Sequence, residues 1–210
     1  MPVITVEGKS SIFRAAERGT LTVSLTTRGS QRIDTLTRHN ERHNALVALA
    51  VARRDANVAT WHQAGRVGTW SHTTKDDGVV HRAHSTVQIK YRGFEALAED
   101  VARLAEVDGT SVSVGWALTE DTKRELTTLA QGRAIADATG KARSYADAVR
   151  SGGGSDISLT KVTEAHLVRA TSAVPGSYTR GSAGGASGQA QITTPDIEAE
   201  AAVVAEFLLP

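Results

Sequence analysis

Strict alternation between apolar and polar residues over positions 19–29 is the feature that most restricts how this chain can fold. In the stretch GTLTVSLTTRG, Leu21, Val23 and Leu25 point one way, while the intervening threonine and serine side chains point the other way. Successive side chains of a strand face opposite sides of a sheet, so the pattern predicts a strand with one buried and one polar face. The chain therefore needs a second layer that covers the apolar side of this sheet.

Other stretches show strand patterns of the same kind. The sequence Lys-Asp-Asp-Gly at 75–78 contains an Asp-Gly pair, which supplies the residues that a tight hairpin turn needs, and it lies between two β-branched runs. We therefore expect a long β-hairpin over 58–91. The remaining expected strands are residues 3–8, 110–120, 156–170 and 196–208, the last of which has Ile197, Ala199, Ala201, Val203, Ala205 and Phe207 on one face.

Three segments carry helical periodicity, at 31–53, 94–107 and 121–150. Ser30 is a plausible N-cap for the first of them. The third is rich in alanine and contains two glycines, Gly132 and Gly140, each of which costs about 1 kcal/mol in a helix relative to alanine. Such small residues predict a close approach to a sheet or to another helix, so Ala138→Leu is expected to disrupt folding or assembly.

The order of these elements predicts an α+β fold with two layers, in which a mostly antiparallel sheet has about three helices packed on one face. We expect residues 1–210 to form a single domain with a flexible Gly/Ser-rich loop at about 172–191. Only 4% of the residues are aromatic, so the three tryptophans and three phenylalanines are expected to anchor the core.

Composition excludes several functional classes. The chain of 210 residues has no cysteine, which rules out disulfides, thiolate metal sites and a cysteine nucleophile. Its net charge of +1 produces no strong field towards nucleic acid or membrane. Neither a signal peptide nor a membrane span is visible in the sequence, so the expected location is cytoplasmic.

The stretch RHNERHN at 38–44 could be half of a metal site or the polar part of a packed helix. On a helix, His39 and His43 lie about 40° apart and could share a zinc ion, whereas Glu41 projects away from both. A catalytic zinc needs three protein ligands, so the packed helix is the preferred interpretation. It places His43 and Asn40 on the core-facing stripe, together with Ile33, Leu36, Val47 and Ala50.

The glycine-containing motifs also fail to define a site. EGKSS at 7–11 lacks the glycine that a phosphate-binding loop requires five residues earlier, and it leads into a strand rather than a helix. SGGGS at 151–155 and GSAGGASG at 181–188 lack the strand–turn–helix frame of a dinucleotide site. The sequence therefore assigns no catalytic, cofactor-binding or metal-binding residue, and no cofactor.

Two sets of polar residues leave functional alternatives open. The arginines around the first helix are not interleaved with aromatic residues, so we expect no nucleic-acid partner. The second set consists of histidines in and near the predicted hairpin. They leave open a small-molecule-binding, metal-binding or hydrolytic protein that uses His62, His72, His81 or His84, although His81 and His84 should face opposite sides of their strand.

Several motifs in this order resemble the SIMPL-domain family, a bacterial family of unknown function. They are ITVEGKSS at the start, LTVSLTTRG, NERHNALVALA with Asn40 and Asn44, VSVGWALTE at 112–120, and the helix with Ala134, Ala138, Lys141 and Ala142. The resemblance implies a two-layer α+β fold and homo-oligomerisation. For some relatives it implies a link to oxidative-stress defence or kinase-associated signalling, and it implies no catalytic residues. We therefore expect a non-enzymatic, self-assembling scaffold or interaction module.

Overall fold

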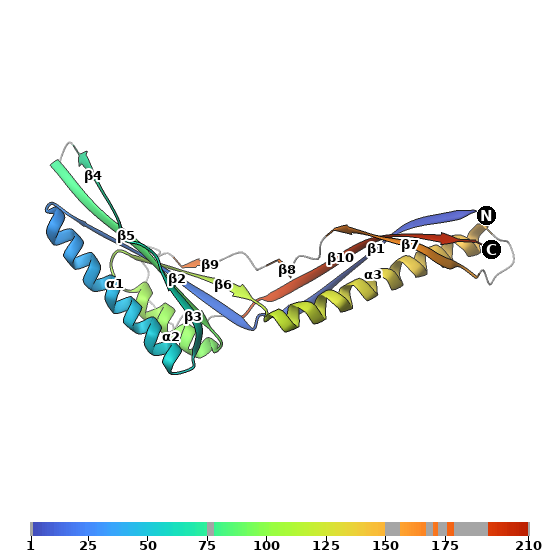
Figure 1. Ribbon diagram of the computed structural model, residues 1–210, viewed down its shortest axis with the longest axis horizontal. Coiled ribbons are helices and arrows are strands. Elements are labelled where there is room, and N and C mark those ends of the chain that lie inside the picture. Colours follow the sequence, from blue (N-terminus) through green and yellow to red (C-terminus); the bar gives the residue numbers. More distant parts are fainter. Residues whose placement is uncertain are drawn as a thin grey trace, which may run out of the picture. The chain divides into compact units, whose positions relative to one another are not determined.

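The computed structural model describes residues 2–74, 78–149, 156–166, 170–171, 176–178 and 193–209 (Figure 1). Contacts within the chain define two compact units, neither of which is a continuous stretch of sequence. Unit 1 comprises Met1–Ala15, Leu118–Ser172 and Asp196–Pro210, and unit 2 comprises Ala16–Ala117 and Ala173–Pro195. The single-domain assignment stays a prediction.

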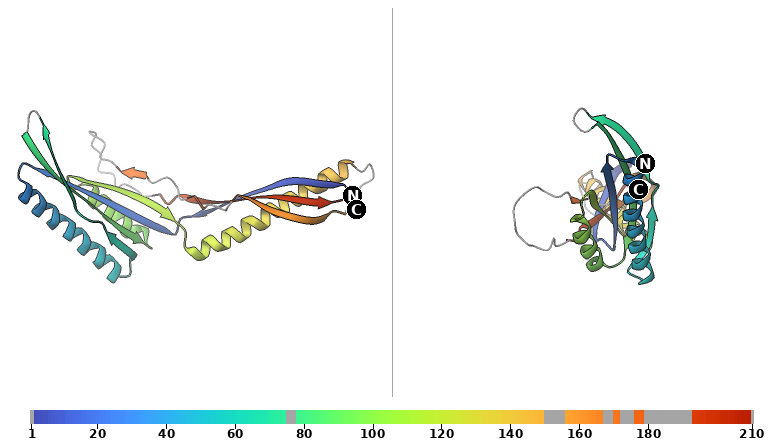
Figure 2. Two further views of the ribbon diagram at one scale, coloured as in Figure 1. Left: turned by 45° about the horizontal axis from the view of Figure 1, so that its top comes forward. Right: turned by 90° about the vertical axis from the view of Figure 1, so that its left-hand side faces the viewer.

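Unit 1 is a small antiparallel sheet with one long helix packed on it. The central strand β10 (Asp196–Leu208) pairs with β1 (Val3–Ala15) along the whole length of both strands, and on its other side with β7 (Ser158–His166). The short strand β8 (Ala170–Thr171) also pairs with β10. The two ends of the chain lie side by side, since the Leu209 N–H donates to the Pro2 carbonyl at 3.1 Å (Figure 2).

The helix α3 (Glu120–Val149) packs on β1 and β10 through a row of alanines. Ala134 and Ala138 are fully buried over Gly8 of β1, where any Cβ atom would overlap the Ala134 carbonyl oxygen. The predicted close approach is therefore present, and it involves the predicted Ala134, Ala138 and Ala142 but not the two glycines of the helix. Gly132 and Gly140 have open space beside them, and the contact is made by Gly8 together with the alanines at 130, 134, 138, 142 and 146.

Unit 2 has a wider antiparallel sheet with the strand order β3-β5-β2-β6-β9, and β4 also pairs with β5. The strands β3 (Ala59–Ala64) and β4 (Gly68–Thr74) follow one another along β5 (Gly78–Tyr91), which confirms the predicted long hairpin. On the other side of β5, β2 (Arg18–Gly29) pairs with β6 (Thr110–Ala117), which pairs with the short β9 (Gly176–Tyr178).

Two helices cover one face of this sheet, α1 (Arg32–Asp55) and α2 (Phe94–Ala105) (Figure 1). The alternation that the sequence predicts is obeyed, because Leu21, Val23 and Leu25 of β2 and their apolar cross-strand partners in β5 and β6 face these helices. The buried residues of that face are Leu21, Val23, Leu25, Val87, Ile89, Tyr91, Val112, Val114 and Trp116.

The α+β class with antiparallel sheets is confirmed, but the three helices do not share one sheet. Two of them cover the sheet of unit 2, and the third covers the sheet of unit 1. The first strand is also longer than predicted, since it continues to Ala15. It pairs with the last strand of the chain, whereas β2 pairs with β5 and β6, and only these long-range partners reveal that there are two sheets.

Three local predictions need correction. Ser30 is not the N-cap, because α1 begins after Gln31, whose side chain makes no capping bond to the described residues. Trp61, Trp70 and Phe13 are 43%, 47% and 61% exposed, so only some of the aromatic residues anchor the core. Of the loop expected at 172–191, residues 176–178 form β9, and residues 172–175 and 179–191 lie outside the described part of the chain.

Candidate functional site

Of the polar residues in RHNERHN, His39 and His43 face the sheet of unit 2 from α1, whereas Arg38, Asn40, Glu41 and Asn44 are exposed. His39 is completely buried, with Nδ1 at 3.1 Å from Thr27 Oγ1 and Nε2 at 2.9 Å from Ser85 Oγ. His43 Nδ1 lies 3.0 Å from the same Ser85 oxygen. Since Ser85 has one hydroxyl proton, it can donate to only one imidazole and accepts from the other. The four side chains form a hydrogen-bonded cluster that joins the helix to two strands.

This arrangement favours the packed-helix interpretation over the metal site. Both ring nitrogens of His39 already contact hydroxyl groups, which leaves neither nitrogen directed at a shared ion. Burial, and then the neighbouring His43, lowers the pKa of His39, so the neutral imidazole is favoured. No group of three or more potential metal ligands occurs among the described residues.

The core-facing stripe of α1 agrees with the predicted one at Ala50 and His43 and differs from it at other positions. The buried residues are Thr35, His39, Leu46 and Ala50, whereas Asn40 is exposed and Ile33 is 79% exposed. A stripe that contains a threonine and a histidine is hard to recognise, because both residue types are common on helix surfaces. The hydroxyl partners that allow His39 to be buried come from β2 and β5, which are distant in sequence.

We expect the stability of unit 2 to fall as the pH drops below about 6.5, the usual pKa of histidine. A lowered pKa in the folded state means that the unfolded chain binds more protons in this range, so His39 contributes up to about 1.4 kcal/mol per pH unit. Urea unfolding followed by tryptophan fluorescence, between about pH 7.5 and 5.5, measures the slope. His39→Gln should flatten it, whereas His72→Gln should keep it. Equal slopes in all three proteins would contradict a buried neutral His39.

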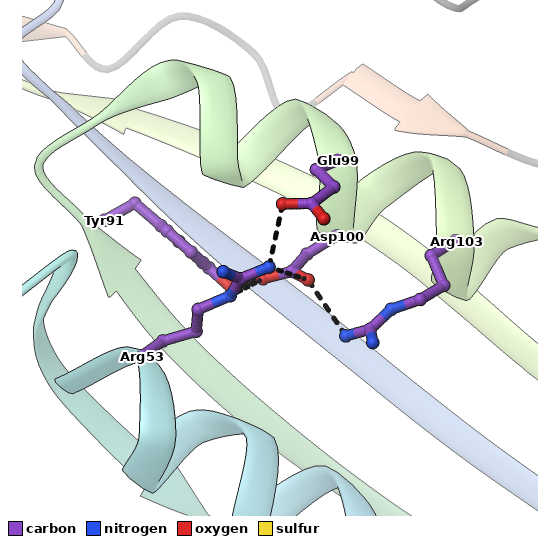
Figure 3. Close-up of polar contacts among 5 residues, drawn as sticks. All are labelled: Arg53, Tyr91, Glu99, Asp100 and Arg103. Atoms are coloured by element: carbon purple, nitrogen blue, oxygen red, sulfur yellow. Dashed lines mark hydrogen bonds and ion pairs between the residues drawn. The ribbon is translucent and has the colours of Figure 1, made fainter. Parts of the chain in front are cut away.

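A second polar cluster joins α1, β5 and α2 around Asp100, which is fully buried (Figure 3). The Arg53 guanidinium donates from Nε to Oδ2 at 2.8 Å and from Nη2 to Oδ1 at 2.9 Å. The Tyr91 hydroxyl donates to Oδ2 at 2.5 Å, and Arg103 donates to Oδ1 at 2.9 Å. Arg53 also reaches the exposed Glu99 at 3.0 Å. Four donated hydrogen bonds therefore satisfy both oxygens of one buried carboxylate.

The pKa shifts in this cluster favour a structural role over an acid–base role. The hydrogen bond to Asp100 raises the pKa of Arg53. Burial, and then the hydrogen bond to Asp100, raises the pKa of Tyr91. Both groups therefore stay protonated. A general acid or base needs a pKa near the working pH, and neither group has one. We conclude that the cluster holds α2 against α1 and β5.

Asp100 is not among the residues expected from the sequence to form a site, although its position on the helix carries one signal. In FEALAEDVARLAEV, position 100 comes three residues after Leu97 and four before Leu104, and both leucines are buried. An acidic residue on the apolar stripe of a helix needs a buried cationic partner. That partner is Arg53, which is 47 positions away in sequence, so the pairing itself could not be identified from spacing.

The hairpin histidines are not brought together. His62 lies opposite Ile89 and His72 lies opposite Val80, nine positions apart along β5. His81 and His84 face opposite sides of the sheet, as predicted. His81 Nδ1 lies 2.6 Å from the Ser71 hydroxyl, beside a cavity of about 130 Å³ at the start of α1. A cross-strand Ser–His contact alone defines no reaction, so a hydrolytic or ligand-binding role stays a prediction.

The fold and these two clusters define an α+β protein with two helix-covered antiparallel sheets, in which the buried histidine and aspartate serve packing. The family model of SIMPL, described as a protein of unknown function (DUF541), matches residues 4–207. The chain therefore belongs to the SIMPL family, and the resemblance of its motifs is confirmed. No curated protein matches the chain.

The location of the protein stays a prediction. Within the described ranges, no helix is both long and apolar enough to cross a membrane.

Proposed function

We propose that this SIMPL-family protein is non-enzymatic and acts as a self-assembling scaffold or interaction module. The observation that carries the proposal is the outer edge of the sheet in unit 1. In the strand order β1-β10-β7, β7 is an edge strand among the strands that the structure describes. An edge presents unpaired N–H and C=O groups that can pair with another chain. Leu159 and Val162 of β7 are 45% and 41% exposed and would add apolar contact area.

The opposite edge of this sheet, formed by β1, is covered by side chains of α3, so β7 is the edge that we propose for assembly. The Lys9 N–H of β1 donates to Asp137 of α3 at 2.9 Å, and Lys141 donates to the Glu7 carbonyl at 2.9 Å. Lys141 and Asp137 also pair with each other at 2.7 Å. The hydrogen bonds from Lys141 and Lys9 lower the pKa of Asp137 and keep it charged. These side chains occupy the middle of the β1 edge, where another strand would have to pair.

A role in oxidative-stress defence belongs to the same proposal. The chain has no cysteine and one methionine, so it has no thiol that could reduce an oxidant. A stress-related role would therefore depend on holding other molecules together, which is compatible with a scaffold and requires no redox chemistry from this chain.

Light scattering coupled to gel filtration, at several protein concentrations, tests the proposal. We expect a mass that is a multiple of the monomer mass. The double variant Leu159→Lys/Val162→Lys should weaken association by about tenfold or more, since each lost apolar contact is worth on the order of 1 kcal/mol. The matched control is Val79→Lys, which changes a residue of unit 2 that is 50% exposed.

The control variant should assemble like the unchanged protein. A strict monomer at all concentrations would refute self-assembly. An oligomer that is equally stable in all three proteins would refute the role of the β7 edge.

A further inference from the structure

The face of the unit 2 sheet opposite α1 and α2, which no described helix covers, has an unusual combination of side chains. The helices α1 and α2 contact the face that carries Leu21, Val23 and Leu25, as the bonds of His39 to Thr27 and Ser85 and of Asp100 to Tyr91 show. The register places the alternate residues on the other face. Its centre consists of half-exposed hydroxyl and amide side chains, namely Thr20, Thr22, Ser24, Thr26, Thr86, Gln88 and Ser113.

The charged side chains that the described strands place on this face are all cationic. Arg18 and Arg28 of β2 and Arg82 and Lys90 of β5 all belong to it, because Arg28 lies directly opposite Arg82 and Thr20 directly opposite Lys90. Among the described strand residues of this face there is no aspartate or glutamate. Like charges directly opposite each other repel and destabilise a sheet. A bound anion would reduce this repulsion, so the pattern favours an anionic ligand.

Two exposed tryptophans complete the arrangement, and each has a cation as its direct cross-strand neighbour. Trp61 of β3 lies opposite Lys90, and Trp70 of β4 lies opposite Arg82. Their side chains are 43% and 47% exposed. The Arg82 Nε is buried and has no hydrogen-bond partner among the described residues. An aromatic surface beside a cation is suited to a ligand that has both a flat ring and a negative charge.

The two tryptophan–cation pairs are separated by eight residues of β5. At a rise of about 3.3 Å per residue, this separation is roughly 26 Å. An extended chain of several units can span that length, whereas a single small anion cannot contact both ends. The hydroxyl and amide groups between the pairs offer hydrogen bonds to sugars and base edges.

We propose that this face binds single-stranded nucleic acid, with bases stacked on Trp61 and Trp70 and phosphates held by the neighbouring cations. Sheets that bind single strands use this combination of aromatic surfaces and positive charge. The proposal departs from the expectation drawn from the sequence alone. There, the arginines near the first helix lacked interleaved aromatic residues, and only the pairing of β3 and β4 with β5 brings tryptophans and cations together.

Binding is measured by fluorescence anisotropy with labelled oligo(dT) and oligo(U) of about twelve nucleotides, a length within the range that such surfaces occupy. We expect saturable binding that weakens with salt, with a log–log slope of up to about −3 for four cations. Trp61→Ala and Trp70→Ala should each reduce affinity roughly 5- to 100-fold. Lys90→Gln should reduce the magnitude of the salt slope by about 0.7, the contribution of one cation on a single strand. The two oligomers distinguish DNA from RNA as the ligand.

Matched controls come from unit 1. Phe13→Ala removes an aromatic side chain that is 61% exposed, and Arg124→Gln removes an exposed cation, so neither should change the affinity. Dextran sulfate serves as a competitor that has charge and sugar but no bases. The proposal is overturned if no oligomer binds at low salt. It is also overturned if the tryptophan variants bind like the unchanged protein while dextran sulfate displaces the oligomers completely, since the face would then bind anionic polysaccharide. Self-assembly and this binding are measured separately, so either can fail alone.

Discussion

Gly8→Ala is expected to destabilise unit 1 by about 3 kcal/mol, because the added methyl group has no space. It would overlap the Ala134 carbonyl oxygen and lie 2.8 Å from the Ala138 Cβ atom, and both belong to the rigid backbone region of α3. The strand and the helix would have to separate, which opens the alanine-lined contact along its length. Ala138→Leu adds bulk to the same contact from the helix side and should have an effect of the same sign.

Thermal and urea unfolding followed by circular dichroism measure this effect. The matched control is Gly140→Ala in the same helix, since a Cβ atom there meets nothing within 4 Å among the described residues. Alanine is the better helix former, so this control should gain about 0.5–1 kcal/mol. Opposite signs for the two glycines would establish that the contact at Gly8 is steric. If Gly8→Ala unfolds at the same urea concentration as the unchanged protein, then the strand and helix are not packed as closely as described.

Asp100→Asn should destabilise unit 2 by about 3–5 kcal/mol. The substitution keeps the shape of the side chain but removes the negative charge, which leaves Arg53 and Arg103 without the carboxylate that both contact. Tyr91, whose hydroxyl donates to the same carboxylate, has no exposed surface and cannot exchange this bond for one to water. Tryptophan fluorescence reports this unfolding, because all three tryptophans belong to unit 2.

Glu99→Gln provides the control for the Asp100 variant. Glu99 contacts the same arginine at 3.0 Å, but its side chain is 67% exposed, so the loss should be below about 0.5 kcal/mol. The double variant Arg53→Met/Asp100→Asn should cost less than the sum of its single variants, since removing both partners leaves less uncompensated charge. Equal losses for Glu99→Gln and Asp100→Asn would show that burial does not strengthen this ion pair.

Local patterns predicted the individual elements well. The three helices begin and end within two residues of their predicted bounds, because their apolar periodicity is set by their own sequences. The alternate residues from Ile197 to Phe207 are all buried, as the pattern of the last strand predicted. Membership of the SIMPL family was also recognisable, since its motifs occur in order along the chain.

Details that depend on a distant partner were missed. In the sequence, Arg53 is one of the basic residues at the end of a helix, and only the structure places Asp100 beside it. Likewise, His39 resembles a surface residue in the sequence, and only the structure shows its hydrogen bonds to Thr27 and Ser85. The same holds for Gly8, which in the sequence is one glycine of a strand and in the fold is the point of contact with α3.

The amino-acid sequence by itself thus determined the helices, the alternating strands and the family, because each of these depends on the spacing of residues within one segment. The tertiary structure alone decided that the strands form two sheets, which polar groups are buried together, and which face carries tryptophans beside cations. The two sheets and the buried polar groups depend on contacts between residues far apart in sequence, up to 205 positions for Val3 and Leu208, which no local pattern specifies. The tryptophan–cation pairs depend on the register of the hairpin strands, which the predicted hairpin did not fix.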